Sequence, residues 1–95
     1  MSQTKVLAVF CYDVSKDHAR NKLADLLETE AVRVQESVFE GWMSERRAHA
    51  IGEKAVRLIA SDDSLRIYVL PLGSAMRTFT FGATPPVEAD EFHLL

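Results

Sequence analysis

The chain has 95 residues, of which 47% are apolar and 26% charged, and its formal net charge at pH 7 is -3. A chain of this length predicts one domain with a thin core, because it buries only about 60 to 65% of the surface that its unfolded form exposes. No apolar run approaches the roughly 20 residues of a membrane span, no signal peptide is visible, and a single cysteine excludes an intrachain disulfide. We therefore expect a cytoplasmic protein without a membrane partner.

The first half of the chain predicts a strand, a helix and a pair of strands. Residues Lys5 to Tyr12 are nearly continuously apolar, which is typical of a central strand. We expect Ser15 or Asp17 to cap the following helix. Its predicted apolar face consists of Ala19, Leu23, Leu26 and Leu27. Residues 31–35 and 37–43 are rich in valine and aromatic side chains, which favours two short strands with a tight connection.

The second half predicts another helix and another strand. Ser44 is a good N-cap, and Gly52 is an expected weak point inside the helix, worth about 1 kcal/mol relative to alanine. The predicted apolar face consists of Ala48, Ile51, Ala55, Leu58 and Ile59. Residues 61–64 form a polar turn, and the strand Leu65 to Leu70 follows it. The order βαββαβ predicts an α+β ferredoxin-like sandwich, with both helices on one face of a four-stranded antiparallel sheet.

The end of the chain differs in charge from the rest. Residues 83–95 contain three acids and no base, so residues 1–82 carry eleven bases and eleven acids. We divide the chain into a ferredoxin-like domain, residues 1–82, and an acidic carboxyl-terminal extension, residues 83–95. Phosphate binding needs a local basic face more than a high overall pI, so the negative net charge does not exclude a nucleic-acid partner.

Asp13 is the first candidate for chemistry. A carboxylate at the carboxyl end of a buried strand has lost solvation, and a metal, a cation or helix-start amides compensate for that loss. Capping of the next helix or its turn is the alternative reading. Three basic residues follow Asp13, and they either bind phosphates or are simply solvated surface residues: Lys16, Arg20 and Lys22. His18 is the nearest candidate general base, but this position is more typical of a surface residue.

Three segments, taken in order, resemble one known family. Cys11-Tyr12-Asp13 ends the apolar run, Arg33-Val34-Gln35-Glu36-Ser37-Val38-Phe39-Glu40 follows one helix later, and Leu65 to Leu70 comes after that. The pattern resembles the CRISPR-associated Cas-two (Cas2) family of spacer-acquisition proteins over about residues 5 to 70. The resemblance implies a homodimer that is partnered by the Cas-one (Cas1) integrase and binds duplex DNA.

The same resemblance implies an activity and its residues. The family's proposed chemistry is metal-dependent phosphodiester hydrolysis of RNA or DNA, in which Asp13 of both protomers is the catalytic residue and holds Mg²⁺. The resemblance also implies that five residues bind the nucleic acid: Lys16, Arg20, Lys22, Arg33 and Ser37. Val38 and Phe39 are expected in the core or the dimer interface. A carboxyl-terminal strand, either residues 77–81 with Phe79 and Phe81 or residues 91–95 beyond Pro85-Pro86, is expected to reach the neighbour's sheet.

Other interpretations remain open at this point. A toxin-like ribonuclease related to virulence-associated protein D shares the fold and the early aspartate, and a ferredoxin-like module that binds a small regulatory ligand is a second alternative. The RNA-recognition fold is set aside because residues 38–42 lack its basic start, and a metallochaperone needs two close cysteines. We expect Cys11 and Trp42 to be packing residues. Arg46-Arg47 at a helix start predicts a counter-anion, either a phosphate or a neighbouring carboxylate.

Overall fold

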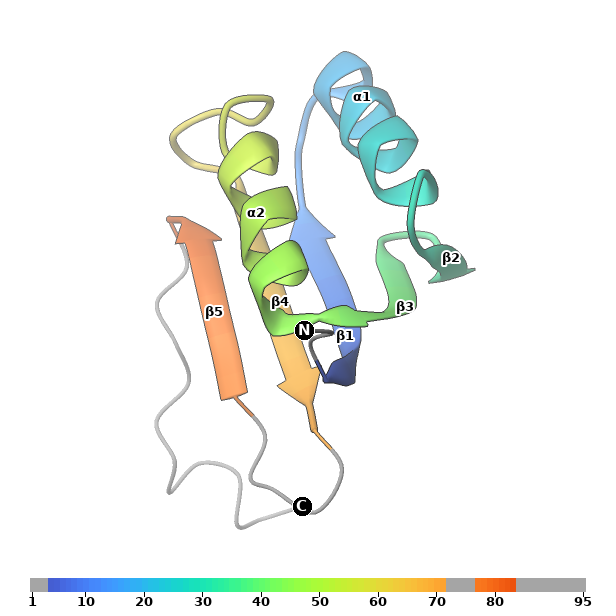
Figure 1. Ribbon diagram of the computed structural model, residues 1–95. Coiled ribbons are helices and arrows are strands. Elements are labelled where there is room, and N and C mark those ends of the chain that lie inside the picture. Colours follow the sequence, from blue (N-terminus) through green and yellow to red (C-terminus); the bar gives the residue numbers. More distant parts are fainter. Residues whose placement is uncertain (1–3, 72–76, 84–95) are drawn as a thin grey trace, which may run out of the picture.

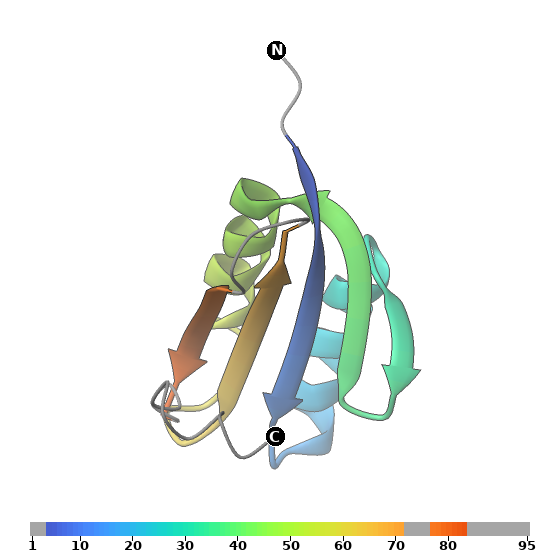
Figure 2. The same ribbon diagram turned by 90° about the horizontal axis from the view of Figure 1, so that it is seen from below.

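The computed structural model describes residues 4–71 and 77–83, and its elements follow the predicted order with one further strand. They are β1 (Lys5–Asp13), α1 (Asp17–Glu28), β2 (Val32–Gln35), β3 (Val38–Ser44), α2 (Glu45–Ala55), β4 (Ser64–Leu70) and β5 (Arg77–Gly82). The strands form one antiparallel sheet in the order β2-β3-β1-β4-β5. Both helices lie on one face of this sheet, as Figures 1 and 2 show. The predicted α+β ferredoxin-like fold is confirmed.

The core lies between the helices and the face of the sheet that they cover. Alternate residues of β1 point into it, and Phe10 sits opposite Phe39 of β3 on one side and Ile67 of β4 on the other. All three side chains are wholly buried. Helix α1 contributes Leu23, Ala24 and Leu27, and helix α2 contributes Ala48, Ile51, Gly52 and Ala55. Each large apolar side chain buried in this way contributes about 1.5 to 3 kcal/mol.

The helix starts differ in how well the sequence predicted them. Ser44 caps α2 as expected, since its hydroxyl accepts a hydrogen bond from the amide of Arg47 at 3.0 Å. The predicted cap of α1 was wrong. Lys16 occupies the N-cap position without a side-chain hydrogen bond, Ser15 bonds elsewhere, and Asp17 is already helical. The prediction failed because Ser15 has a tertiary partner that competes with local capping.

Helix α2 is also shorter than its apolar periodicity suggested. It ends at Ala55, and the chain continues in a turn in which the amide of Leu58 donates to the carbonyl of Ala55 at 2.9 Å. Ile59 still packs against the core. At the other end of the helix, the Arg47 Nε atom lies 2.8 and 2.6 Å from the carboxylate oxygens of Glu30. The expected counter-anion is therefore the carboxylate of Glu30. The hydrogen bond between the two side chains lowers the pKa of Glu30 and raises the pKa of Arg47.

Strand β5 pairs with β4 of the same chain. Phe81 lies opposite Leu65 and Phe79 opposite Ile67, and both rings contact the imidazole of His49 on α2, at centroid distances of 5.6 and 5.5 Å. Residues 77–81 therefore extend the sheet of their own chain and do not cross to a neighbour's, whereas the assignment of Phe79 and Phe81 to a dimer interface stays a prediction. Pro85-Pro86 and residues 91–95 lie outside the described residues, and the domain boundary at residue 82 stays a prediction.

No helix of the described residues lies over the other face of the sheet, and we call it the open face (Figure 2). In register across its strands lie Leu7, Val9 and Cys11 of β1, Val38 and Trp42 of β3, and Arg66, Tyr68 and Leu70 of β4. Trp42 is 57% exposed and Cys11 half-buried, so neither is the core residue that we expected. Phe39 points to the covered face and is wholly buried, so of its two expected positions, the core and the dimer interface, it occupies the core.

Candidate active site at the end of β1

Asp13 is the last residue of β1 and lies at the rim of the open face. Tyr12 before it and Val14 after it are buried, whereas Asp13 is exposed, because side chains alternate between the two faces along a strand. Its register partner on β4 is Ser64. The strand thus presents a solvated carboxylate at the end of the central part of the sheet, rather than a helix cap.

Tyr12 brings the turn between β2 and β3 to the same place. Its backbone amide donates to the carbonyl of Ser37 at 3.1 Å, and its hydroxyl donates to the carbonyl of Glu36 at 3.2 Å. Its ring stacks on Phe39 at a centroid distance of 6.3 Å. These contacts hold Ser37 beside Asp13, in a hollow of about 320 Å³. The hollow is lined by Tyr12, Asp13, Val14, Arg20, Glu36 and Ser37.

Two further hollows adjoin the first and share Tyr12 with it. One, of about 240 Å³, opens at the rim of the open face and is lined by Cys11, Tyr12, Asp13, Ser64 and Arg66. The other, of about 300 Å³, is lined by Tyr12, Asp17, Arg20, Asn21, Arg33 and Glu36. The structure therefore gathers Asp13, Arg20, Arg33 and Ser37 around one strand end. Lys16, Lys22 and His18 are exposed and line none of these three hollows.

The two arginines that the structure does gather are held by neighbours. Arg20 donates through Nη1 to the carbonyl oxygens of Val14 at 3.1 Å and Ser15 at 3.4 Å, and it pairs with Asp17. The guanidinium carbon of Arg33 lies 5.1 Å from the centroid of the Phe39 ring, which is a cation–π contact. These contacts favour orientations that keep both positive charges near Asp13.

Arg66 was missed by the sequence analysis. It sits opposite Cys11 on β4, on the same face as Asp13, and lines the same hollow. Burial raises the pKa of the Cys11 thiol, and the charge of Arg66 acts against this rise. The alternation within residues 65–70 does place Arg66 away from the core, but its closeness to Asp13 depends on the register between β1 and β4, which the sequence does not reveal.

Asp63 was also missed, since the sequence shows it only as one member of a polar turn. It is 3% exposed and bonded to Ser15 and Ala60. Backbone hydrogen bonds from Ala60 and then from Ser15 lower the pKa of its carboxyl. A buried carboxylate immediately before the first residue of a strand indicates a functional position only when its distant hydrogen-bond partner is known.

The donors around Asp13 suit a hard cation. Within residues 4–71 and 77–83 no cluster of three or more His, Cys, Asp or Glu side chains is positioned to hold a metal. In one chain the carboxylates that line the first hollow are those of Asp13 and Glu36, and both residues are exposed. Mg²⁺ keeps several of its waters and is commonly held by one or two carboxylates together with substrate phosphate, so this sparse oxygen set fits it better than it fits Zn²⁺.

Fold and site together define a class of protein. It is a small ferredoxin-like domain with one uncovered sheet face, an exposed carboxylate at the end of a central strand, and arginines around that carboxylate. In the described part of the chain, no helix has the length and apolar character that crossing a membrane requires.

Comparisons with known proteins identify the family. The family described as CRISPR associated protein Cas2 matches residues 6–77. A CRISPR-associated endoribonuclease Cas2 of Synechocystis is 37% identical over 82 residues, which cover 85% of this chain and 88% of the relative. A CRISPR-associated endonuclease Cas2 of Thermus thermophilus is 38% identical over 82 residues, covering 85% of this chain and 89% of the relative. A crystal structure of Cas2 superimposes with a TM-score of 0.66 at 26% identity, covering 90% of this chain and 98% of that one.

The chain belongs to the CRISPR-associated Cas2 family. This membership removes the basis for the two alternatives, the ribonuclease related to virulence-associated protein D and the regulatory module.

Proposed function

We propose that this protein is a nuclease of CRISPR adaptation whose catalytic residue is Asp13. The observation that carries the proposal is the position of this carboxylate, exposed at the end of β1 where the hollows lined by Ser37, Arg20 and Arg66 meet. The names of the Synechocystis and Thermus relatives, endoribonuclease and endonuclease, support the same class of reaction. The substrate class is therefore a nucleic-acid phosphodiester.

Each residue has a role that follows from its chemistry. Arg66 and Arg33 lie on either side of the strand end, and guanidinium groups bind phosphate oxygens by paired hydrogen bonds. Ser37 offers a hydroxyl to the same backbone. Asp13 would hold Mg²⁺, and the bound ion would supply positive charge for the developing oxyanion and lower the pKa of a water. Lys16 and Lys22, away from the hollows, contact phosphates further along the strand.

We propose that the working form is a homodimer through the open face. Trp42 and Leu70 are 57% and 39% exposed there, beside the half-buried Leu7 and Val9. An apolar patch of this kind on a soluble protein marks an interaction surface. An isologous contact applies the same patch twice, so it brings two copies of the strand end that carries Asp13 to one interface. The partner's Asp13 then adds a further carboxylate at this interface.

A second function is favoured by the sparse donor set of the site. No histidine lines the three hollows, and of their three carboxylate residues, Asp13, Glu36 and Asp17, the last is paired with Arg20. The dimer is therefore also suited to act as a scaffold. In this role it bridges copies of the Cas1 integrase and sets the length of the duplex DNA held between them. Contacts to phosphates alone make such binding independent of sequence and steeply weaker at high salt.

The test is cleavage of labelled single-stranded RNA and duplex DNA with Mg²⁺ or with chelator. We expect Asp13→Asn to lower the Mg²⁺-dependent rate by at least about a hundredfold, because it removes the charge of the carboxylate and keeps its size. Asp25→Asn is the matched control, since Asp25 is exposed on α1 and loses the same charge. Equal rates for Asp13→Asn and wild type would reject the nuclease and leave the scaffold, which a salt titration of duplex binding then tests.

A further inference from the structure

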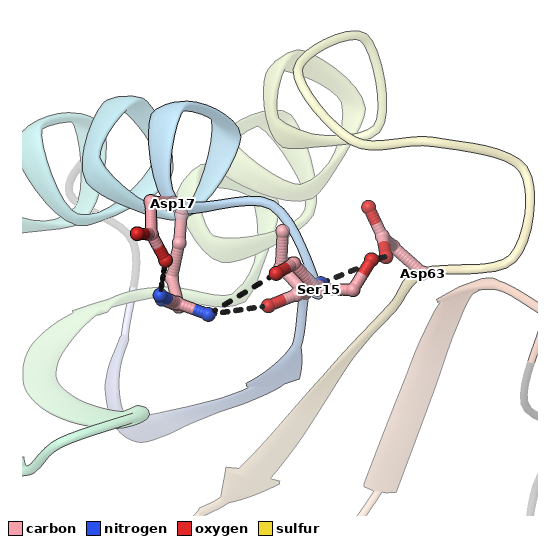
Figure 3. Close-up of polar contacts among 5 residues, drawn as sticks. Ser15, Asp17 and Asp63 are labelled. Atoms are coloured by element: carbon pink, nitrogen blue, oxygen red, sulfur yellow. Dashed lines mark hydrogen bonds and ion pairs between the residues drawn. The ribbon is translucent and has the colours of Figure 1, made fainter.

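We propose that Asp63 is the positioning residue for Asp13: its buried carboxylate clamps the loop between β1 and α1 and thereby sets where the carboxylate of Asp13 lies. The inference rests on the proposed function in one respect, namely that the position of Asp13 matters for cleavage. The clamp itself is a property of the structure, and Figure 3 shows it reaching from the turn before β4 to the loop after β1.

The clamp consists of three hydrogen bonds that Asp63 accepts. Its Oδ1 atom receives the amide of Ser15 at 3.2 Å and the hydroxyl of Ser15 at 3.4 Å, and its Oδ2 atom receives the amide of Ala60 at 2.8 Å. The side chain is 3% exposed, so little water competes for these bonds. A buried carboxylate that accepts backbone N–H groups on both oxygens is a strong and directional anchor.

Arg20 holds the same loop from the other side. It donates to the carbonyl of Ser15, so both backbone polar groups of Ser15 are bound by side chains from other elements. It also donates to the carbonyl of Val14, whose side chain is buried at 4% exposure. The two residues that follow Asp13 are thus fixed, and little freedom is left in the backbone that aims its carboxylate.

Asp63 is itself fixed by the far edge of the sheet. Its carbonyl accepts a hydrogen bond from the amide of Ala83 at 3.0 Å. Gly82 has a φ of +103°, and a Cβ atom at this position would lie 2.2 Å from the same carbonyl, so the close approach requires glycine. Next along the chain, Ser64 is the register partner of Asp13. Asp63 therefore acts on Asp13 in two ways, through Ser15 in the loop after β1 and through Ser64 in the neighbouring strand β4.

The first arm of the test measures cleavage by Asp63→Asn. Asparagine has one acceptor oxygen and one NH₂ donor, so it cannot accept from Ser15 and Ala60 together. Groups that orient a catalytic ligand typically contribute 10- to 100-fold to activity. We expect kcat to fall by about that factor with KM for the nucleic acid and the dimer mass unchanged. Ser15→Ala, which removes only the hydroxyl contact, should lower kcat by a few fold.

Two controls separate positioning from general stability. Asp62→Asn removes the same charge from the exposed neighbouring residue, and Ile51→Val loosens the core within α2. Both should keep the wild-type kcat at a temperature well below unfolding. The proposal is overturned if Asp63→Asn and Ser15→Ala match these controls, or if Ile51→Val lowers kcat as much as Asp63→Asn does.

The second arm needs neither metal nor nucleic acid. Amide hydrogen exchange at Ser15, followed by NMR, should accelerate at least about tenfold in Asp63→Asn and stay unchanged in Asp62→Asn. Unchanged exchange overturns the clamp even in an active enzyme. If the wild type shows no cleavage that depends on Asp13, the proposed nuclease fails, and this arm alone then decides whether Asp63 positions the loop.

Discussion

The two faces of the sheet use the same strands but differ in what covers them. On β4, Ile67 points to the helices and is wholly buried, whereas the next residue, Tyr68, points to the open face and is half-buried. Both faces carry apolar side chains, although an antiparallel sheet with one solvated face usually alternates apolar with polar residues. The helices therefore cover only one of the two sheet faces that carry apolar side chains.

The faces also differ in chemistry. The covered face buries its polar groups only where hydrogen bonds satisfy them, and among the described residues no buried side-chain nitrogen or oxygen lacks a partner. The open face ends in Asp13 and Arg66, at the hollow between β1 and β4. The core therefore lies on one face, and the candidate active site lies at the rim of the other.

The largest expected effect comes from the covered face. Ile67→Ala should lower the free energy of unfolding by about 2 to 5 kcal/mol, because it removes wholly buried methyl groups and leaves a cavity. Urea denaturation followed by circular dichroism measures the loss. Tyr68→Ala, one residue further along, is the control at concentrations where the chain is monomeric, and it should cost less than about 1 kcal/mol. If both variants lost the same free energy of unfolding, the covered face would not contribute more to stability than the open face.

The next effect concerns association through the open face. Val9 lies between Glu40 of β3 and Tyr68 of β4, so a lysine there gains a nearby carboxylate in the monomer but carries its charge into a dimer interface. We expect Val9→Lys to raise the dimer dissociation constant at least about a hundredfold, measured by sedimentation equilibrium.

Val56→Lys provides the matched control for this experiment. Val56 is 38% exposed at the end of α2, away from the sheet, and the same substitution there should leave the dimer intact. A dimer that tolerates Val9→Lys and dissociates with Val56→Lys would place the contact on the helical side and reverse the comparison.

A smaller effect tests how tightly the covered face is filled. Gly52 was expected to weaken α2, but a Cβ atom at this position would lie 2.5 Å from Cε1 of Phe81 and 3.0 Å from Cδ1 of Ile67. Overpacking of this kind costs about 1 to 3 kcal/mol, against a gain in helix propensity of about 1 kcal/mol. Gly52→Ala should therefore destabilise the protein by about 1 kcal/mol in thermal or urea unfolding.

A double-mutant cycle identifies the cause of this loss. In a Phe81→Leu background the added methyl group meets a smaller side chain, so Gly52→Ala should become neutral or stabilising, with a coupling energy of about 1 kcal/mol. An unchanged penalty in that background would mean that β5 does not pack on α2 in solution.

Most of the fold was predictable because it depends on local periodicity. The nearly continuous apolar run of β1, the apolar alternation of β4 and the helical stripes through Leu23 and Ile51 identified these elements. The partner of β5 was not predictable, since any open sheet edge can accept a strand and the sequence does not distinguish an edge of the same chain from that of a neighbour. The α1 cap failed for a related reason, because Ser15 bonds to a residue 48 positions away.

Some residues of the candidate site were likewise predictable from the sequence, and others were not. Asp13 was predictable from the end of an apolar strand, and the motif that contains Arg33 and Ser37 follows it in a recognisable order. Lys16 and Lys22 were grouped with Asp13 by closeness in sequence, but helix geometry turns them away from the hollows. Arg66 and Asp63 approach Asp13 only through strand register and tertiary hydrogen bonds, which sequence patterns do not encode.

The smallest expected effect is the loss of folding stability at low pH that Asp63 causes in the turn before β4. The pKa of Asp63 is lowered in the folded protein, chiefly by the amides of Ala60 and Ser15 and further by the charge of Lys16. The unfolded chain therefore takes up this proton first, and the stability that Asp63 contributes is complete above its ordinary pKa of about 4 and is lost as the pH falls through the folded value.

Urea midpoints measured between pH 7 and pH 3 test this expectation. Wild type and Asp62→Asn should lose stability in parallel below about pH 4, whereas Asp63→Asn should start lower at pH 7 and show a flatter profile. The Glu30 carboxyl, which Arg47 shifts in the same direction, is present in all three proteins and cancels from the comparison. If the urea midpoint of Asp63→Asn changed with pH in parallel with those of the other two proteins, the Asp63 carboxylate would not be the charged acceptor of the Ser15 and Ala60 hydrogen bonds.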